Sequence, residues 1–168
     1  MELYAVDKLI SEARRLAAEY RKATGQSLGI TAEIARHDVA RLLGLELVPN
    51  QTSGGYDAVG TGRWAGKRIQ IKGRAIFDEA KAGQRIGQLK TNQAWDLVML
   101  VLMDENFEPL EIYEAERDEI FAYLNASDSK RSKRGALSVA RFKIIGRLVW
   151  TRENGREDEG YWDNTASL

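Results

Sequence analysis

The chain has 168 residues, the size of one domain with a substantial buried core. Apolar residues make up 43% and charged residues 30%, a balance typical of soluble globular proteins. The absence of cysteine excludes a disulfide framework and any thiolate site, and it fits a reducing cytoplasm. No apolar run approaches the roughly 18 residues of a membrane span, and residues 1–4 lack a signal-peptide pattern. We therefore expect a cytoplasmic protein without a membrane partner.

The charges of the chain sum to zero, but they are unevenly distributed. Residues 63–74 hold five basic and no acidic side chains, and residues 129–152 hold eight basic and none acidic. Residues 104–119 hold eight acidic side chains and one arginine. Because a neutral total can hide a basic face, the two basic segments keep nucleic acid among the possible partners.

Two helices are predicted at the start of the chain. Apolar residues recur at helical spacing over 2–24, and Gly25 is a plausible C-terminal stop. Thr31 is placed to cap a second helix that runs to Leu43 and ends at Gly44.

The second predicted helix also carries two residues of chemical interest. Glu33 and the single histidine, His37, lie four residues apart and so share a face of this helix. His37 is either a general base or a packed or surface residue, and the sequence leaves both open.

A sheet is predicted from the middle of the chain. Residues 45–48 form a short candidate strand, and the near-continuous apolar run 95–103 fits a strand buried on both faces. Residues 108–113 alternate and look like its neighbour, with an acidic outer side. A helix over 116–124 follows.

The remaining segments are less regular. Residues 77–89 read as a loop or short helix, and residues 137–150 fit either a helix or a strand. The expected architecture is a single α/β (α+β) domain over 1–152, with a mixed central sheet flanked by helices. Residues 153–168 are expected to form an acidic, flexible tail.

The most informative stretch is a predicted hairpin that joins residues 56–59 to residues 68–73 through a tight turn. Alternation puts Arg68, Gln70 and Lys72 on one strand face, with Ile69 and Ile71 on the other. If the hairpin is symmetric about Trp64 and Ala65, Asp57 lies opposite Lys72, with Gln70 one diagonal step away. Trp64, at the tip, would then be a wedge near DNA or a partner contact.

These residues resemble the motif of the PD-(D/E)XK nuclease superfamily, which has the restriction-endonuclease-like fold. In that motif an acid begins one strand, a second acid and a lysine lie two apart on the next, and a helix glutamate often joins them. Asp57, Lys72 and Glu33 match three positions, and Gln70 stands where the second acid is usual. The Gln-x-Lys form is similar to that of Mrr-like restriction enzymes, which cut modified DNA.

The resemblance implies a metal-dependent DNA endonuclease of the restriction or resolvase type that acts as a homodimer. Mg²⁺ or Mn²⁺ would be held by Asp57, Glu33 and the amide oxygen of Gln70, a neutral and weaker ligand. Lys72 would orient the attacking water or offset charge in the transition state.

Basic residues beside this site and on the later loop are expected to hold the DNA backbone: Arg63, Lys67, Arg68, Arg74, Lys130, Arg131, Lys133 and Arg134. Two other readings stay open. Because Gln70 replaces the usual acid, the protein could be a member of the same fold that binds DNA without cutting it. The acidic segments are also compatible with a protein-interaction domain.

Overall fold

The computed structural model describes residues 3–49, 54–77, 84–126 and 135–157. The helices are α1 (Leu3–Thr24), α2 (Thr31–Leu43), the short 3₁₀ helix η1 (Gly62–Trp64), α3 (Arg117–Ala126) and α5 (Val139–Ile145). The strands are β1 (Glu46–Leu47), β2 (Ala58–Val59), β3 (Arg68–Ala75), β4 (Arg85–Gln88), β5 (Leu97–Met103), β6 (Pro109–Glu116), β7 (Ala136–Ser138), β8 (Arg147–Thr151) and β9 (Gly155–Arg156).

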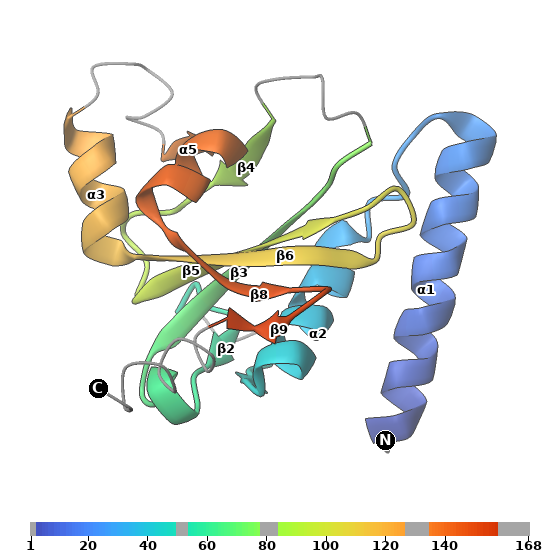
Figure 1. Cartoon of the computed structure of the whole chain (residues 1–168), viewed down its shortest axis with the longest axis horizontal. Coiled ribbons are helices and arrows are strands. Elements are labelled where there is room, and N and C mark those ends of the chain that lie inside the picture. The colour runs from blue at the N-terminus through green and yellow to red at the C-terminus, as the bar shows by residue number, and fades with distance from the viewer. Residues whose placement is uncertain (1–2, 50–53, 78–83, 127–134, 158–168) are drawn as a thin grey trace.

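The centre of the molecule is a mixed sheet with the strand order β1-β2-β3-β5-β6-β8-β9. β3 and β5 run parallel, and every other neighbouring pair in this sheet is antiparallel. In Figure 1, α2 lies on one side of the sheet, while α3, α5 and β4 lie on the other. The predicted α/β architecture, a mixed sheet flanked by helices, is therefore confirmed.

Burial on both faces explains why β5 is the centre of the sheet. All seven of its residues are buried, as the apolar run predicted. Side chains of odd-numbered residues join the core beneath α2, and those of Val98, Leu100 and Leu102 join the second core, beneath α3 and α5. β5 thus separates two apolar layers and positions its neighbouring strand β3 between them.

The first two helices follow the predicted bounds closely. α1 ends at Thr24 and α2 at Leu43, where Gly44 adopts the left-handed conformation that a β-carbon disfavours (φ 69°). Thr31 is the first helical residue rather than the cap; the cap position is Ile30, which provides no side-chain hydrogen bond. No helix among the described residues is both long and apolar enough to cross a membrane.

Three segments differ from the expectation. Residues 85–88 form the strand β4, which pairs with β7 in a separate two-stranded ribbon, whereas a loop or short helix was predicted there. The ambiguous segment 137–150 contains both kinds of structure, part of β7, then α5 and β8. Residues 153–157 are not tail, because β9 pairs with β8; residues 158–168 lie outside the described part.

Candidate active site at the β2–β3 edge

Asp57 lies where the chain enters β2, and backbone contacts hold it on both sides. Its N–H donates to the carbonyl oxygen of Ile69 (2.8 Å), and its carbonyl oxygen accepts from the N–H of Val48 (2.9 Å). Its carboxylate oxygen Oδ2 accepts from the N–H of Ile71 (2.7 Å), in the peptide that joins Gln70 to Ile71. The carboxylate is therefore fixed against the middle of β3.

The register of this hairpin corrects one prediction. Ala58 pairs with Ile69 and Val59 with Arg68, so the next position along places Asp57 across from Gln70, not Lys72. The hairpin is centred one residue earlier than expected, because η1 fills the turn and Trp64 packs into the core.

The alternation predicted for β3 is confirmed. Ile69, Ile71 and Gly73 are buried beneath α2, where a β-carbon on Gly73 would lie only 2.4 Å from the β-carbon of Ala35. Gln70 and Lys72 point to the opposite face and are half-buried. The two motif residues therefore share a face, as the strand period requires.

Gln70 contains an unusual atom. Its Oε1 is fully buried, yet within the described part of the chain it has no hydrogen-bond partner. A buried acceptor without a donor costs about 1–3 kcal/mol, so it calls for a bound water, an ion or another ligand; Gln84 Oε1 is a second such atom in the described part of the chain. The orphaned oxygen belongs to the residue across from Asp57.

Lys72 lies in an unfavourable environment for a cation. Its Nζ donates one long hydrogen bond to the carbonyl oxygen of Gln88 (3.4 Å). Burial lowers the pKa of the Lys72 ammonium below its ordinary value; Asp57 raises it in part, and Arg74 and Lys90 lower it further. The net effect is a lowered pKa, a shift that is frequent for lysines at functional sites.

β4 forms the roof over this face of β3. Gly87, at φ 83°, brings the β4 backbone close, so that an added β-carbon would lie 3.3 Å from Nη2 of Arg74 and 4.0 Å from Nζ of Lys72. The Arg74 guanidinium donates to the carbonyl oxygens of Gly73 and Arg85, and burial lowers its pKa. A glycine at this point lets the strand close over both cations.

The helix residue that reaches Asp57 is Arg36. Its Nε lies 3.4 Å from Oδ1 of Asp57, at an angle that makes no hydrogen bond, so this buried N–H lacks a partner among the described residues. Its Nη2 donates to the carbonyl oxygen of Val48. Glu33 is exposed, one turn before Arg36. The sequence reasoning missed Arg36, although its three-residue spacing from Glu33 places both on one face of α2.

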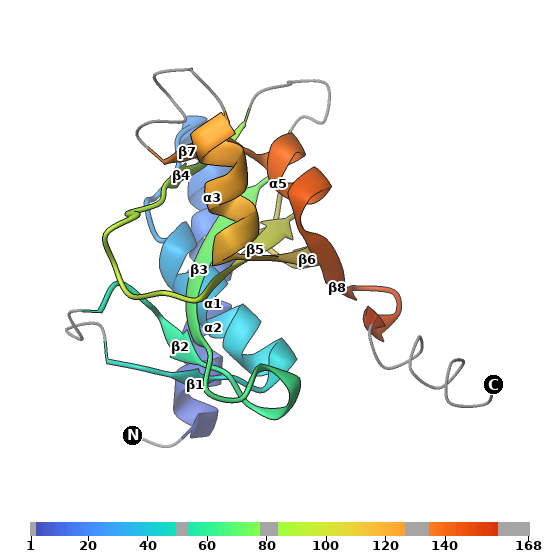
Figure 2. The same cartoon turned by 90° about the vertical axis from the view of Figure 1, so that its left-hand side faces the viewer.

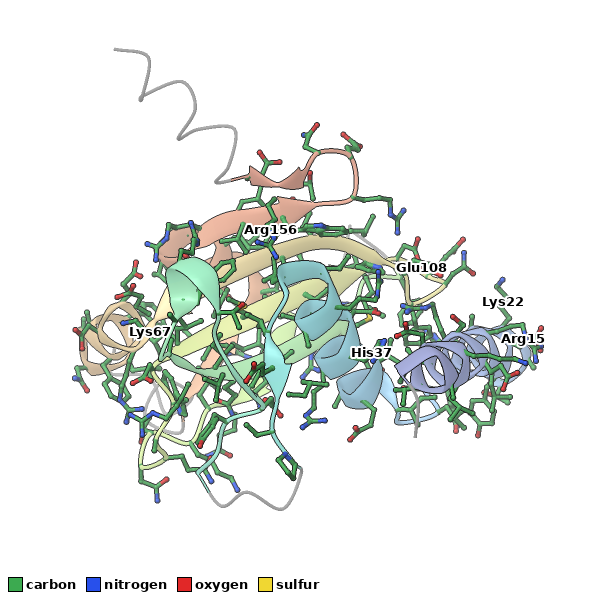
Figure 3. All side chains as sticks on the ribbon, turned by 90° about the horizontal axis from the view of Figure 1, so that it is seen from below. Arg15, Lys22, His37, Lys67, Glu108 and Arg156 are labelled. Carbon is green, nitrogen blue, oxygen red and sulfur yellow. The ribbon has the colours of Figure 1, made fainter. Side chains whose placement is uncertain are left out.

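Several residues expected to hold DNA make contacts within the protein instead. Arg68 donates two side-chain hydrogen bonds to Asp96 (3.1 and 3.2 Å). Arg63 pairs with Glu114 (2.7 Å) and stacks on Trp64. Lys67 is exposed on the hairpin and is visible at one side of the molecule in Figure 3. Residues 130–134, with the other four expected DNA contacts, lie outside the described residues.

Trp64 is neither a wedge nor an exposed contact. It is buried, and its Nε1 donates to Oε2 of Glu114 (2.5 Å). Glu114 is buried as well, in a strand predicted to have an acidic outer side. The pair joins the hairpin turn to β6, so Trp64 has a structural role.

Among the described residues, part of the segregated charge of the sequence is paired in the fold. Arg147 lies within 4 Å of Glu114, Glu116 and Glu119, at 3.1, 3.8 and 3.5 Å. Arg152 pairs with Asp104 (2.8 Å). The acidic segment 104–119 and the later basic segment thus lie side by side on β6 and β8, which removes part of the basic surface that the sequence suggested.

His37 lies away from the Lys72 face, in a pocket of about 320 Å³ between α1 and α2. Its Nε2 is 2.9 Å from Oδ1 of Asp7, and it is partly buried, so it matches the packed-residue alternative. Figure 3 shows His37 extending from α2 toward α1.

The side chains at the β2–β3 edge could bind a hard cation only through their oxygen atoms, and water would have to supply the remaining ligands. Among the described residues, no group of three or more histidine, cysteine or acidic side chains could hold a metal ion. Asp57 supplies one carboxylate, and the unpartnered Oε1 of Gln70 supplies a neutral oxygen. Mg²⁺ keeps several waters and often takes only one or two protein carboxylates, so this donor set is sufficient in kind.

Comparison with known proteins adds no identification. No protein-family model matches the sequence, and a search of curated proteins also finds no match.

Proposed function

We propose that the protein is a metal-dependent endonuclease that hydrolyses DNA phosphodiester bonds, with its active site at Asp57, Gln70 and Lys72. The observation that carries the proposal is the buried, unpartnered Oε1 of Gln70 opposite a fixed carboxylate. An oxygen left without a donor there is readily satisfied by a cation. Asp57 and the Gln-x-Lys pair also lie on adjacent antiparallel strands, in the order that the resemblance requires.

In this proposal each side chain has a separate task. Asp57 and Gln70 hold Mg²⁺ or Mn²⁺, which would supply a Lewis acid and a more acidic bound water. The N–H of Ile71 fixes Oδ2 of Asp57, so Oδ1, which faces Nε of Arg36 at 3.4 Å, is the carboxylate oxygen that would bind the metal ion. Lys72 would hydrogen-bond the attacking water or the non-bridging phosphate oxygen, and its lowered pKa makes it a stronger proton donor than an ordinary lysine.

Arg36 offers a further interaction in the same site. Its buried Nε has no hydrogen-bond acceptor among the described residues and faces Oδ1 of Asp57. A phosphate oxygen bound beside Asp57 would provide that acceptor. Glu33, one turn away and exposed, would complete the metal ligands through water.

The test is cleavage of plasmid DNA with Mg²⁺ or Mn²⁺, using unmodified and base-modified plasmids. Asp57→Ala and Lys72→Ala should each lower the cleavage rate by at least about a hundredfold, while Lys22→Ala, at an exposed lysine on α1, should retain near-normal rates. Glu33→Ala decides whether the helix glutamate takes part. Equal cleavage by wild type and the Asp57 variant would exclude this site.

A second function, DNA binding without cleavage, is favoured by one specific feature. Lys72 lies near Arg74 and Lys90 as well as Asp57, and Arg36 forms an ion pair with Asp57, so cations outnumber the carboxylate in this region. Such an excess suits a phosphate better than a metal ion. DNA binding with a steep salt dependence but no cleavage in either metal would support this alternative. Gln70→Glu is the discriminating variant, because regained cleavage would show a competent scaffold.

The homodimer expected from the resemblance is also a proposal. Two copies would place two sites on the two strands of a duplex. Sedimentation of the protein with a short duplex would measure how many copies bind each duplex.

A further inference from the structure

The connection between β4 and β5, segment 89–96, lies beside the proposed site and is fixed near both ends in the core. Leu89 is buried, and its N–H donates to the carbonyl oxygen of Gly135 (3.0 Å). Trp95 is buried as well, and its indole Nε1 donates back to the carbonyl oxygen of Lys90 (2.9 Å). Figure 2 shows the segment leaving β4 and passing below the first turn of α3 into β5. It is therefore a fixed part of the fold rather than a free loop.

Arg117, the first residue of α3, holds this segment from inside. Its guanidinium donates to three carbonyl oxygens of the segment, those of Thr91 (2.7 Å), Gln93 (2.9 Å) and Trp95 (2.6 Å). Its own N–H donates to a fourth, that of Asp96 (3.0 Å), and its guanidinium lies over the Trp95 ring. A guanidinium presents its donors in one rigid plane, so it can set the relative positions of several carbonyl groups at once. Arg117 therefore fixes the backbone of the segment between its two buried residues.

The side chains that this backbone leaves outside are polar. Lys90, Thr91 and Asn92 are all exposed. Gln88, just before the segment, accepts a hydrogen bond from Nζ of Lys72 (3.4 Å), and Lys90 is close enough to Lys72 for the two charges to interact. The segment thus presents an exposed ammonium group near the half-buried one of the site.

The later part of the segment contacts the residues that lead into Asp57. The N–H of Ala94 donates to the carbonyl oxygen of Gly54 (2.9 Å). Gly55, at φ 75°, lies so close to Gln93 that an added β-carbon would be 2.2 Å from the Oε1 of that side chain. Since Asp57 follows two residues after Gly55, a displaced segment would also disturb the chain that carries this carboxylate.

We propose that Arg117 is a positioning residue of the site, which holds segment 89–96 so that Lys90 binds the DNA backbone beside the phosphate at Lys72. Arg117 itself need not touch the substrate. Two ammonium groups held near each other repel, and a DNA phosphate is the anion that relieves this repulsion. The inference rests on the proposed function for its substrate, but the hold of Arg117 on the segment can be measured without DNA.

The first measurement is hydrogen exchange of the full chain, followed by NMR without DNA. In Arg117→Met the N–H groups of Gln93 and Ala94, bonded to the carbonyl oxygens of Lys90 and Gly54, should exchange at least about tenfold faster relative to those of β5. The matched control is Arg152→Met, which also loses three hydrogen bonds, but beyond the other end of β5. These are to the carboxylate of Asp104 and to the carbonyl oxygens of Glu108 and Pro109. This control should leave the exchange of Gln93 and Ala94 as in wild type.

Binding to a short DNA duplex, measured over a range of salt concentrations, tests the role of the segment. Lys90→Met should weaken binding by about three- to tenfold and reduce the steepness of its salt dependence by about one phosphate contact. Arg117→Met should do the same, and the double variant should bind no more weakly than either single one, because both changes remove one contact. Arg152→Met removes the same charge as Arg117→Met and should bind like wild type.

Arg117→Lys is the milder variant, because it keeps the charge and can still donate to some of the carbonyl groups. It should lie between wild type and Arg117→Met in both measurements, and it decides the question if far-UV circular dichroism shows that Arg117→Met does not fold. Unchanged exchange at Gln93 and Ala94 overturns the inference even if wild type cleaves DNA. Additive losses of affinity overturn the route through Lys90. A wild type that does not bind DNA refutes the proposed function and the phosphate contact together, whereas faster exchange would still assign Arg117 its hold on the segment.

Discussion

Lys72→Met should abolish cleavage and at the same time raise the stability of the fold. Burial, together with Arg74 and Lys90, outweighs the attraction of Asp57, so the native state holds the Lys72 proton less tightly than the unfolded chain does. The hydrogen bond that the variant loses, to the carbonyl oxygen of Gln88, is long at 3.4 Å. Methionine keeps an unbranched side chain one atom shorter than lysine and removes the buried charge. We expect an increase in unfolding free energy of roughly 0.5–2 kcal/mol at pH 7.

The gain in unfolding free energy from Lys72→Met should depend on pH, whereas a gain from better packing would not. A lysine with a lowered native pKa destabilises the fold while it is protonated there, and stability rises as pH increases through the lowered pKa toward the ordinary value of 10.5. The advantage of Lys72→Met should therefore be largest at neutral pH and shrink toward pH 10.5. Urea unfolding of both proteins across this range measures the difference.

The control is Lys67→Met, the same substitution at an exposed lysine on the hairpin. Its unfolding free energy should stay within about 0.5 kcal/mol of wild type at every pH. A less stable Lys72→Met variant, or a difference that does not change with pH, would refute the conclusion that Lys72 is an unfavourably placed cation. Lys72 would then be an ordinary structural residue.

The remaining predictions concern buried polar groups and close packing in the domain, and urea unfolding measures all of them. Asp38→Ala should cost about 3–5 kcal/mol, because Asp38 is fully buried and Arg14 would lose its carboxylate. The double variant with Arg14→Met and Asp38→Leu should lose much less unfolding free energy than Asp38→Ala. Gly73→Ala should cost about 1–3 kcal/mol, since its β-carbon would lie 2.4 Å from that of Ala35. Glu114→Gln should cost about 1–3 kcal/mol by weakening two charged hydrogen bonds, and a loss below 0.5 kcal/mol would contradict that reasoning.

Much of the fold could be predicted because local patterns agree with the tertiary structure. The run at residues 97–103 has no polar face, and only a central strand between two layers buries such a run completely. Gly44 ends α2 because it can adopt a positive φ after the last helical turn. The alternation of β3 placed Gln70 and Lys72 together without any tertiary information.

The errors arise where a contact distant in sequence decides the outcome. The hairpin register depends on Trp64, which packs inward because Glu114, fifty residues away, accepts from its indole N–H. β4 has no apolar period of its own, since Ile86 is its one core residue and Gly87 has a positive φ (83°) close to Arg74 and Lys72. Neither fact can be read from nearby residues.

Charge patterning misleads for a similar reason. The acidic and basic segments are separated along the chain, but β6 and β8 are antiparallel neighbours, so Arg147 meets Glu114 across the ladder. The consequence is that basic runs in the sequence overstate the surface left for DNA. The cations that matter for the site come instead from α2, β3 and the segment after β4: Arg36, Lys72, Arg74 and Lys90.

This distribution of charge gives a physical reason for glutamine at position 70. A glutamate there would face Asp57 and lie two residues from Lys72, on the same strand face. Its negative charge would raise the pKa of Lys72 and stabilise the ammonium, while two carboxylates side by side would repel each other without a metal. The neutral amide avoids both effects: its oxygen remains available as a ligand, and the Lys72 pKa stays low. In the proposed active site, a lysine with a lowered pKa would compensate for the weaker metal ligand.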